Sequence, residues 1–313
     1  MLGLALSFGR AFIVGGLIPS ILFVVFALVI FGQYTLGLGG TNNVFEERPL
    51  GLIIALAVPL AFLILALNAM VIKIYEGAPF LIKNLLRVFL NKNLNIHKLL
   101  YEDLLSFRTE YEKTDDHGKK NSLAQAVEKE WKRIYSQAGN NHLPMDKRRI
   151  MPTRMGNVFA CIEEYPSIRY GMDGMFYWPR LVSVISDKLA EVIGVENINF
   201  IFLLNLSLLS GVLGAAILVG TLSTYLDWIN LGWSLFSVAL FYLFYRLAVG
   251  SLITMGELMK SGFDLYRHEI LRNMKIEIPD NIQQERQLWF SLTNYLASGE
   301  IFYYPNTGKG MDE

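Results

Sequence analysis

The chain holds 313 residues, of which 53% are hydrophobic and only 18% are charged, and its mean hydropathy is +0.35. Water-soluble domains carry about 25% charged residues, so this composition favours a membrane protein. The 28 Lys and Arg residues balance the 28 Asp and Glu residues, which removes the basic excess typical of a nucleic-acid-binding protein. The single cysteine, Cys161, excludes a disulfide framework within the chain and any cysteine-based metal cage.

Four stretches of the sequence are long and apolar enough to form membrane-spanning helices, each of which needs about 20 such residues. They cover about residues 11–32, 50–73, 200–225 and 228–247. The first stretch exceeds the apolar region of a signal peptide and no A-x-A cleavage site follows it, so we expect it to be retained. Pro19 and Pro59 lie inside the first two stretches, where a proline bends a helix.

Lysines and arginines beside the predicted spans indicate their orientation, because positively charged flanks stay in the cytoplasm. In the connections 32–50 and 225–232, Arg48 is the single basic residue, whereas several lysines and arginines lie beside the other ends of the spans. We therefore predict an all-α polytopic membrane protein of four transmembrane helices, with both termini and a helical domain in the cytoplasm. Its expected parts are spans one and two in residues 1–75, the cytoplasmic domain in 76–197, spans three and four in 198–256, and cytoplasmic C-terminal helices in 257–313.

Small residues recur at helical spacing in the third span, at Ser207, Gly211 and Gly214, which lets another helix approach closely. We expect these residues to form a packing face or an interface of a homo-oligomer. Arg246 lies about 28 Å after the start of the fourth span, near the cytoplasmic headgroups, which its side chain could reach. A longer fourth span would instead make Arg246 an intramembrane charge that lines a pore.

The region after the second span predicts two more helices. Apolar residues at three and four spacing, with Lys83, Arg87 and Lys92 between them, predict an amphipathic helix over 80–111. It is expected to lie either on the membrane surface or on the cytoplasmic domain. A polar, exposed helix is expected over about 122–136.

The region after the fourth span predicts a continuing helix and a last, separate one. Glu257–Lys260 and Asp264–Arg267 are opposite charges three residues apart, which pair on a helix. We expect Pro279 to end this helix, and the apolar spacing predicts a last helix over 283–296 that packs on the cytoplasmic domain.

The block 151–181 is the densest in residues with special conformational roles. Thr153 is expected to cap one helix, while Gly171 and Asp173 predict a turn followed by the N-cap of a second. We interpret the block as a structural clamp that joins the cytoplasmic domain to the spans. Its candidate residues are Thr153, Arg154, Asn157, Arg169, Asp173, Trp178 and Arg180.

Four short blocks of the sequence resemble an uncharacterised family of bacterial four-span membrane proteins. They are PTRMGN at 152–157, the run ExYPxxRYGMD that begins at Glu163 and leads to WPRL, Tyr75-Glu76-Gly77, and Gly262–Arg267. The resemblance implies the four-span plan and a bacterial source, so we expect the chain to lie in a bacterial inner (plasma) membrane. It brings no known activity with it.

The sequence contains no P-loop, no nucleophile elbow, no HExxH motif and no dinucleotide-binding fingerprint. We therefore expect no catalytic residues, no cofactor and no metal. One hypothesis is a homo-oligomeric channel whose cytoplasmic domain regulates it. The alternative is a non-catalytic scaffold or assembly factor that presents a cytoplasmic surface to a partner protein. The expected partners are the lipid bilayer, further copies of the chain and a cytoplasmic protein.

Overall fold

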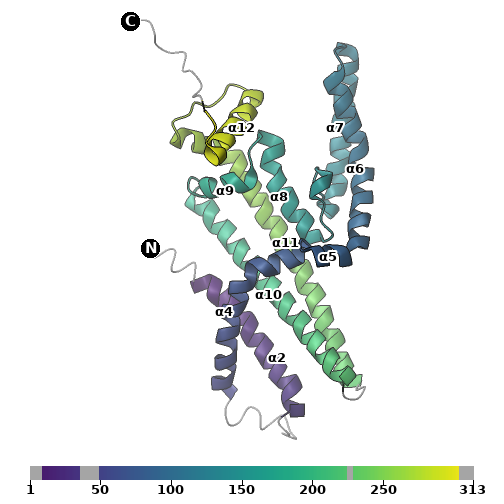
Figure 1. Ribbon diagram of the computed structural model, residues 1–313, viewed down its shortest axis with the longest axis vertical. Coiled ribbons are helices and arrows are strands. Elements are labelled where there is room, and N and C mark those ends of the chain that lie inside the picture. The colour runs from purple at the N-terminus through teal and green to yellow at the C-terminus, as the bar shows by residue number, and fades with distance from the viewer. Residues whose placement is uncertain (1–8, 36–48, 224–227, 303–313) are drawn as a thin grey trace. The chain divides into compact units, whose positions relative to one another are not determined.

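The structure is a computed structural model that describes residues 9–35, 49–223 and 228–302 (Figure 1). Helices account for 86% of these residues, among which there is no strand, so the expectation of a helical chain is confirmed. The chain divides into two compact units. Unit 1 comprises Met1–Ile72 and Val192–Met255, and unit 2 comprises Lys73–Glu191 and Gly256–Glu313.

Four helices in the described part of the chain are long and apolar enough to cross a membrane, as the sequence predicted. They are the π-helix η1 (Ala11–Leu17) continued by α2 (Ile18–Thr35), then α4 (Pro49–Glu76), α10 (Asp187–Ser223) and α11 (Trp228–Asn273). The last two have 37 and 46 residues. At about 1.5 Å per residue both exceed the roughly 30 Å of a bilayer core, so neither fits inside one along its full length.

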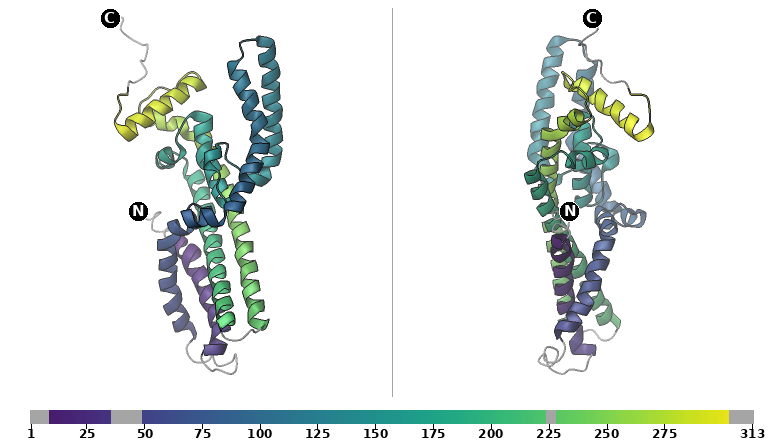
Figure 2. Two further views of the ribbon diagram at one scale, coloured as in Figure 1. Left: turned by 45° about the vertical axis from the view of Figure 1, so that its right-hand side comes forward. Right: turned by 90° about the vertical axis from the view of Figure 1, so that its left-hand side faces the viewer.

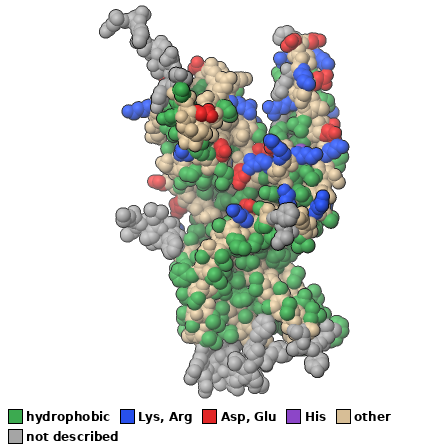
Figure 3. Space-filling view, in the orientation of Figure 1, with side chains coloured by type: hydrophobic (Ala, Val, Ile, Leu, Met, Phe, Trp, Pro, Cys, Tyr) green, Lys and Arg blue, Asp and Glu red, His purple; other side chains and the backbone are tan. Residues whose placement is uncertain are grey.

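Unit 1 leaves many large apolar side chains exposed. On α4, Phe62, Leu63 and Met70 are more than half exposed, whereas Ala57 and Ala61 are fully buried. In the space-filling view, hydrophobic side chains cover the visible faces of these helices, and the coloured charges gather over unit 2 (Figure 3). A water-soluble fold would turn such side chains inward, so this surface is compatible with a lipid environment.

Unit 2 contains the remaining helices, of which several differ in extent from the sequence prediction. They are α5 (Phe80–Leu85), α6 (Arg87–Lys113), α7 (His117–Asn141), the short η2 (Lys147–Arg149), α8 (Arg154–Tyr170), α9 (Gly174–Val182) and α12 (Ile282–Ser298). The single helix predicted over 80–111 is wrong, because the backbone of Leu86 leaves the helical conformation and separates α5 from α6. The polar helix predicted over 122–136 extends instead from His117 to Asn141.

Helices α6 and α7 form an antiparallel hairpin, and they lie side by side in each view (Figure 2). Tyr101 and Leu104 of α6 pack with Leu143, which follows α7. The hydroxyl of Tyr101 donates to the carbonyl of Leu143 at 3.0 Å, and His97 Nε2 lies 3.0 Å from the carbonyl of Met145. These contacts attach the middle of α6 to the segment that leads into α8.

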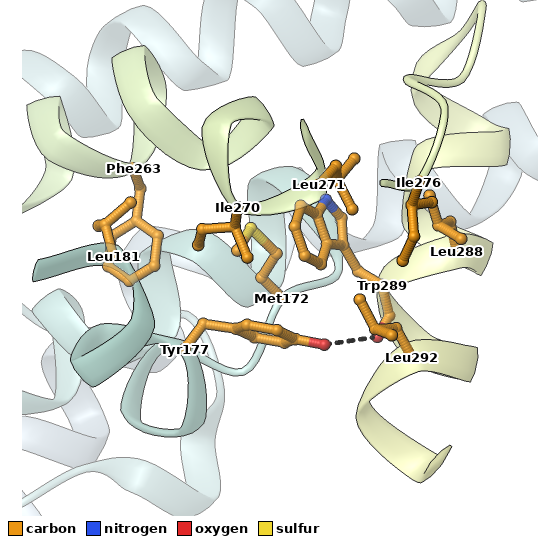
Figure 4. Close-up of a cluster of buried hydrophobic side chains, with 10 residues drawn as sticks. All are labelled: Met172, Tyr177, Leu181, Phe263, Ile270, Leu271, Ile276, Leu288, Trp289 and Leu292. Carbon is orange, nitrogen blue, oxygen red and sulfur yellow. Dashed lines mark hydrogen bonds between the residues drawn. The ribbon is translucent and has the colours of Figure 1, made fainter. Parts of the chain in front are cut away.

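The main core of unit 2 joins α9, α12 and the C-terminal part of α11 (Figure 4). Trp289 of α12 is fully buried, and its ring centroid lies 5.0 Å from that of Tyr177 in an edge-to-face arrangement. Leu271 and Ile276, on either side of the end of α11, complete this cluster.

Helix α11 ends earlier than the sequence predicted, and the assignment of Pro279 as its stop is wrong. Lys275 adopts a left-handed conformation with φ of 57°. Its N–H bonds the carbonyl of Arg272, and the N–H of Ile276 bonds that of Leu271. These two bonds form a Schellman motif, and Leu271 and Ile276 belong to one apolar cluster, as is common in such motifs.

Candidate functional site

The small residues of the third predicted span pack α10 against α11 within unit 1. The hydroxyl of Ser207 donates to the carbonyl of Phe241 at 3.0 Å, and the hydroxyl of Ser234 donates to that of Gly214 at 2.9 Å. A Cβ atom added to Gly211 would lie 2.9 Å from the Phe241 ring. The candidate interface residues therefore serve contact between two helices of the same chain.

Asn205 joins α10 to the first apolar helix at a proline, a contact that the sequence analysis missed. Pro19 has no N–H to donate to the carbonyl of Gly15, and Asn205 Nδ2 donates to this carbonyl at 2.7 Å. The helix widens into the π-helix η1 just before Pro19, and the hydroxyl of Ser20 bonds the carbonyl of Gly16. Asn205 is fully buried, and its Oδ1 accepts no hydrogen bond. An amide inside an apolar span was the available signal.

Arg246 lies apart from this packing face. It is exposed on α11, and its Nη1 is 3.5 Å from the hydroxyl of Tyr242. Five residues after Arg246, the hydroxyl of Ser251 donates to the carbonyl of Glu196 at 3.2 Å. This contact places that part of α11 beside the N-terminal part of α10, which contains the charged residues of that helix. The structure thus does not bring Arg246 together with Ser207, Gly211 or Gly214.

The N-cap predicted at Thr153 is confirmed, and its hydroxyl makes a second contact. The Oγ1 atom accepts from the N–H of Gly156 at 3.0 Å and donates to the carbonyl of Glu76 at 2.9 Å. A Cβ atom added to Gly156 would lie 2.4 Å from that same carbonyl oxygen. Gly77, at φ of 76°, ends α4 beside this cap. Two of the blocks singled out in the sequence therefore meet here.

Asn157 fixes the segment that precedes α8. Its Oδ1 accepts from the N–H of Met151 at 2.8 Å, and its Nδ2 donates to the carbonyl of Met151 at 3.0 Å. Asn93 of α6 donates to the same carbonyl at 2.9 Å. Arg154, which begins α8, has a buried Nε atom without a hydrogen-bond partner.

The predicted N-cap at Asp173 is also confirmed, since its Oδ1 accepts from the N–H of Phe176 at 2.9 Å. The guanidinium of Arg180 lies 4.2 Å from the centroid of the Phe176 ring and donates to the Phe176 carbonyl at 2.7 Å. The Trp178 ring packs 6.1 Å from that of Phe263. These contacts are structural ones made within unit 2.

A carboxylate on α11 receives two tyrosines from α8. Asp264 accepts from the hydroxyl of Tyr165 at 2.9 Å and from that of Tyr170 at 2.6 Å. Burial and the neighbouring carboxylate raise the pKa of both tyrosines. Arg267 stacks 4.0 Å from the Tyr170 ring centroid, and Arg169 lies 5.9 Å from that of Tyr165.

The predicted ion pair between Asp264 and Arg267 is wrong, because both side chains have other partners. Arg267 donates to the main-chain carbonyl of Asp264 and, through Nε, to Glu285 at 2.7 Å. Glu285 is buried on α12, and the same oxygen also accepts from Trp289 Nε1 at 3.1 Å and lies 3.2 Å from His268. Burial alone would raise the pKa of Glu285, but the bonds from Arg267 and Trp289 outweigh it and lower the pKa.

The ion-paired side chains of Arg149 and Glu163 line two open pockets of about 380 and 290 Å³ in unit 2. The adjacent Glu164 points inward, where its Oε1 accepts from the N–H of Asp146 at 3.0 Å and its Oε2 has no partner. Burial raises the pKa of Glu164. Arg149 and Glu163 neutralise each other, so the larger pocket has only Asp173 as an unbalanced charge on its wall, and Glu76 and Arg148 balance each other in the smaller one.

The chemistry available in unit 2 is weak. Burial raises the pKa of Cys161 to about 12, so the thiol stays protonated and is a poor nucleophile at neutral pH. Within residues 9–35, 49–223 and 228–302, no group of three or more His, Cys, Asp or Glu side chains is placed to hold a metal ion.

The fold and these sites define a helical chain with four helices apolar and long enough to span a membrane, joined to a second unit held by charged and aromatic contacts. Comparison with known proteins gives no match: no family model fits the chain, and no curated protein or solved structure is significantly similar. The resemblance to bacterial four-span proteins therefore stays a prediction.

Proposed function

We propose that the chain is a four-span integral membrane protein of a bacterial inner membrane, with both termini and unit 2 in the cytoplasm. The exposed apolar side chains of α2, α4, α10 and α11 support the membrane placement. The basic residues that flank the apolar stretches support the orientation.

Thiol labelling tests this topology. Single cysteines replace Asn42 and Thr109 in a Cys161→Ser background, and intact cells are treated with a membrane-impermeant reagent. We expect labelling at position 42 only. Labelling at position 109 without labelling at 42 would invert the orientation.

For the activity, we propose a non-catalytic platform that binds a partner protein on the α6–α7 hairpin. The observation that carries this proposal is how unit 1 uses its polar side chains. Among the described residues, those buried in unit 1 are uncharged, and Asn205, Ser207 and Ser234 donate to main-chain carbonyls of neighbouring helices. The groove between α2, α10 and α11, of about 110 Å³, is lined by apolar side chains apart from Ser210 and Ser237. Unit 1 is thus built to hold helices together.

The described side chains of the hairpin, in contrast, include an open surface. One face of α6 forms a shallow groove lined by Leu105, Ser106, Thr109, Glu110 and Lys113. Leu105 is 42% exposed there, and the flanking charges carry both signs. An apolar residue with a polar rim suits a helix of a partner protein packed along α6.

Photocrosslinking tests the platform function. A crosslinking amino acid replaces Thr109 in the groove, and the exposed Asp280, near the start of α12, serves as the matched control. In intact cells we expect the crosslinker at position 109 to give one discrete product, in which this chain is joined to a different protein. The crosslinker at position 280 should give no product. The additional substitution Leu105→Asp should abolish that product without changing the unfolding midpoint. No product from Thr109, or one made of two copies of this chain, would contradict the platform.

A homo-oligomeric channel is the second candidate, and one observation favours it. Tyr242, Arg246, Gly250 and Thr254 recur every fourth residue on an exposed face of α11, which would give a polar lining if copies of the chain met there. Arg246→Glu should then shift the reversal potential of reconstituted protein toward cations, since a charge in a narrow passage is poorly screened. Protein that stays oligomeric and passes no current would contradict the channel.

A further inference from the structure

Apolar side chains stand in solvent where α5 meets α6. Leu85, Val88 and Phe89 are 81%, 77% and 57% exposed. Among the leucines of this junction whose side chains the structure describes, Leu86 and Leu90 are partly buried. Burying three such side chains would be favourable, so the junction is a candidate contact surface.

The charge around this junction has one sign. From Gly77 to Tyr101 the sequence holds Lys83, Arg87, Lys92 and Lys98 and no acidic residue. All four of these cations are exposed. A run of cations beside exposed apolar side chains matches a surface of anionic headgroups over acyl chains better than it matches a protein of mixed charge.

The position of the junction along the chain restricts what it can contact. Helix α4 ends at Glu76 with a Schellman motif, in which the N–H of Gly77 bonds the carbonyl of Ile74 and that of Ala78 bonds the carbonyl of Lys73. Three residues then lead to Phe80. At no more than about 3.6 Å per residue, α5 must begin within roughly 14 Å of the end of α4.

We propose that the segment 82–92 is a membrane-surface anchor, which inserts Leu85, Val88 and Phe89 into the cytoplasmic leaflet while its cations contact anionic phosphates. This inference rests on the proposed passage of α4 through the bilayer, because chain connectivity then holds α5 at headgroup depth. Long side chains such as those of Lys83 and Arg87 reach phosphates from either side of the helix. The hairpin beyond α5 would then start from a fixed base at the membrane.

Spin-label accessibility in nanodiscs tests the anchor with the full chain. A nitroxide is attached to a cysteine replacing Val88 in a Cys161→Ser background, with Cys161→Ala as a substitute if that background is unstable. In discs containing phosphatidylglycerol, we expect the label to be reached by oxygen rather than by a water-soluble nickel complex. Each cation contributes about fivefold to association with an anionic surface. The triple variant Lys83→Gln, Arg87→Gln, Lys92→Gln should therefore move the label into water, as should pure phosphatidylcholine discs.

Two matched positions separate the possible failures. A label at Leu63 on α4, which is 55% exposed, should be lipid-accessible, and one at the exposed Ser106 on α6 should be water-accessible. A water-exposed Leu63 would overturn the membrane placement itself. A lipid-exposed Leu63 with a water-exposed Val88 would overturn the anchor alone. A Val88 label protected from both reagents would mean that protein covers the segment. An unchanged signal in the triple variant would mean that anionic lipid does not hold the segment. Either result overturns the anchor.

Discussion

The two units satisfy their buried polar groups in opposite ways. In unit 1, Asn205 and Ser207 are neutral, and each donates to a main-chain carbonyl of another helix. In unit 2, the buried Glu285 is a carboxylate that accepts from Arg267 of α11 and from Trp289 of its own helix, and the exposed carboxylate of Asp264 likewise accepts from two tyrosines of α8. An unpaired charge is far more costly in an apolar environment than an unpaired amide, so the neutral polar groups of unit 1 are compatible with the lipid environment that we propose for it.

The largest expected effect is in unit 2, at Glu285. Its side chain is 7% exposed and that of its partner Arg267 is 16% exposed, so Glu285→Ala leaves a largely buried cation unpaired. We expect a loss of about 3–5 kcal/mol in the free energy of unfolding, measured by chemical denaturation in micelles. The exposed pair Arg272–Glu269 supplies the control, because Glu269→Ala should cost no more than about 1 kcal/mol. Equal losses would mean that burial of the pair does not matter.

The same residue predicts a pH dependence. Because the pKa of Glu285 is lower in the folded than in the unfolded chain, its contribution to stability is present above the unfolded value of about 4.3. The contribution is lost as the pH falls through the folded pKa. The stability difference between the native chain and Glu285→Ala should therefore be constant at neutral pH and shrink below about pH 4. A difference that grows on acidification would contradict the assignment.

The next effect concerns Thr153, which holds two backbone groups at once. Loss of an N-cap costs about 1 kcal/mol, and the bond to the Glu76 carbonyl adds to that, so Thr153→Ala should cost about 2 kcal/mol. Thr153→Ser keeps the hydroxyl and should recover most of this loss. If both variants lose the same stability, the methyl group rather than the hydroxyl carries the effect.

Local features of unit 2 could be predicted from sequence, and its long-range partners could not. The caps at Thr153 and Asp173 depend on residues three positions away, which a sequence displays directly. The partners of Asp264 lie 99 and 94 residues distant, at Tyr165 and Tyr170. Helical spacing predicted Arg267, three residues after Asp264, as its partner. In the folded chain the Arg267 side chain instead donates to Glu285 of α12.

The prediction of unit 1 shows the same division. Apolar length identified its four helices, and helical spacing identified Gly211 and Gly214 as a packing face, because both signals lie in one segment. The partner of the proline-freed carbonyl at Gly15 is 190 residues away, so neither Pro19 nor Asn205 pointed to the other. The end of α11 was misplaced for a different reason, since proline marks helix ends more visibly than a lysine in the left-handed region does.

A smaller effect is expected in unit 1, at Asn205. Hydrogen bonds between helices in membranes contribute about 0.6–1.7 kcal/mol, so Asn205→Leu should cost about 1 kcal/mol. Pro19→Ala restores an N–H that can reach the Gly15 carbonyl, so the double variant should lose less than the sum of the two single losses. Unfolding in mixed micelles measures this cycle. Additive losses would show that Asn205 and Pro19 are not coupled, and would remove the neutral bridge on which the comparison between the units depends.

The smallest expected effect is a gain in stability at Lys275, where unit 2 carries backbone strain rather than charge. A non-glycine residue in the left-handed region costs about 1–2 kcal/mol, because its Cβ crowds the following carbonyl. Lys275→Gly removes this cost, but it also raises the conformational entropy of the unfolded chain, which lowers the free energy of unfolding by about 0.4–1 kcal/mol. The net gain should be about 0.5 kcal/mol in equilibrium unfolding. Lys275→Ala is the matched control: it removes the same exposed side chain but keeps the Cβ, so it should gain nothing. Equal stability of the two variants would show that the Schellman motif ends α11 without strain at this residue, and that the left-handed lysine has no cost there.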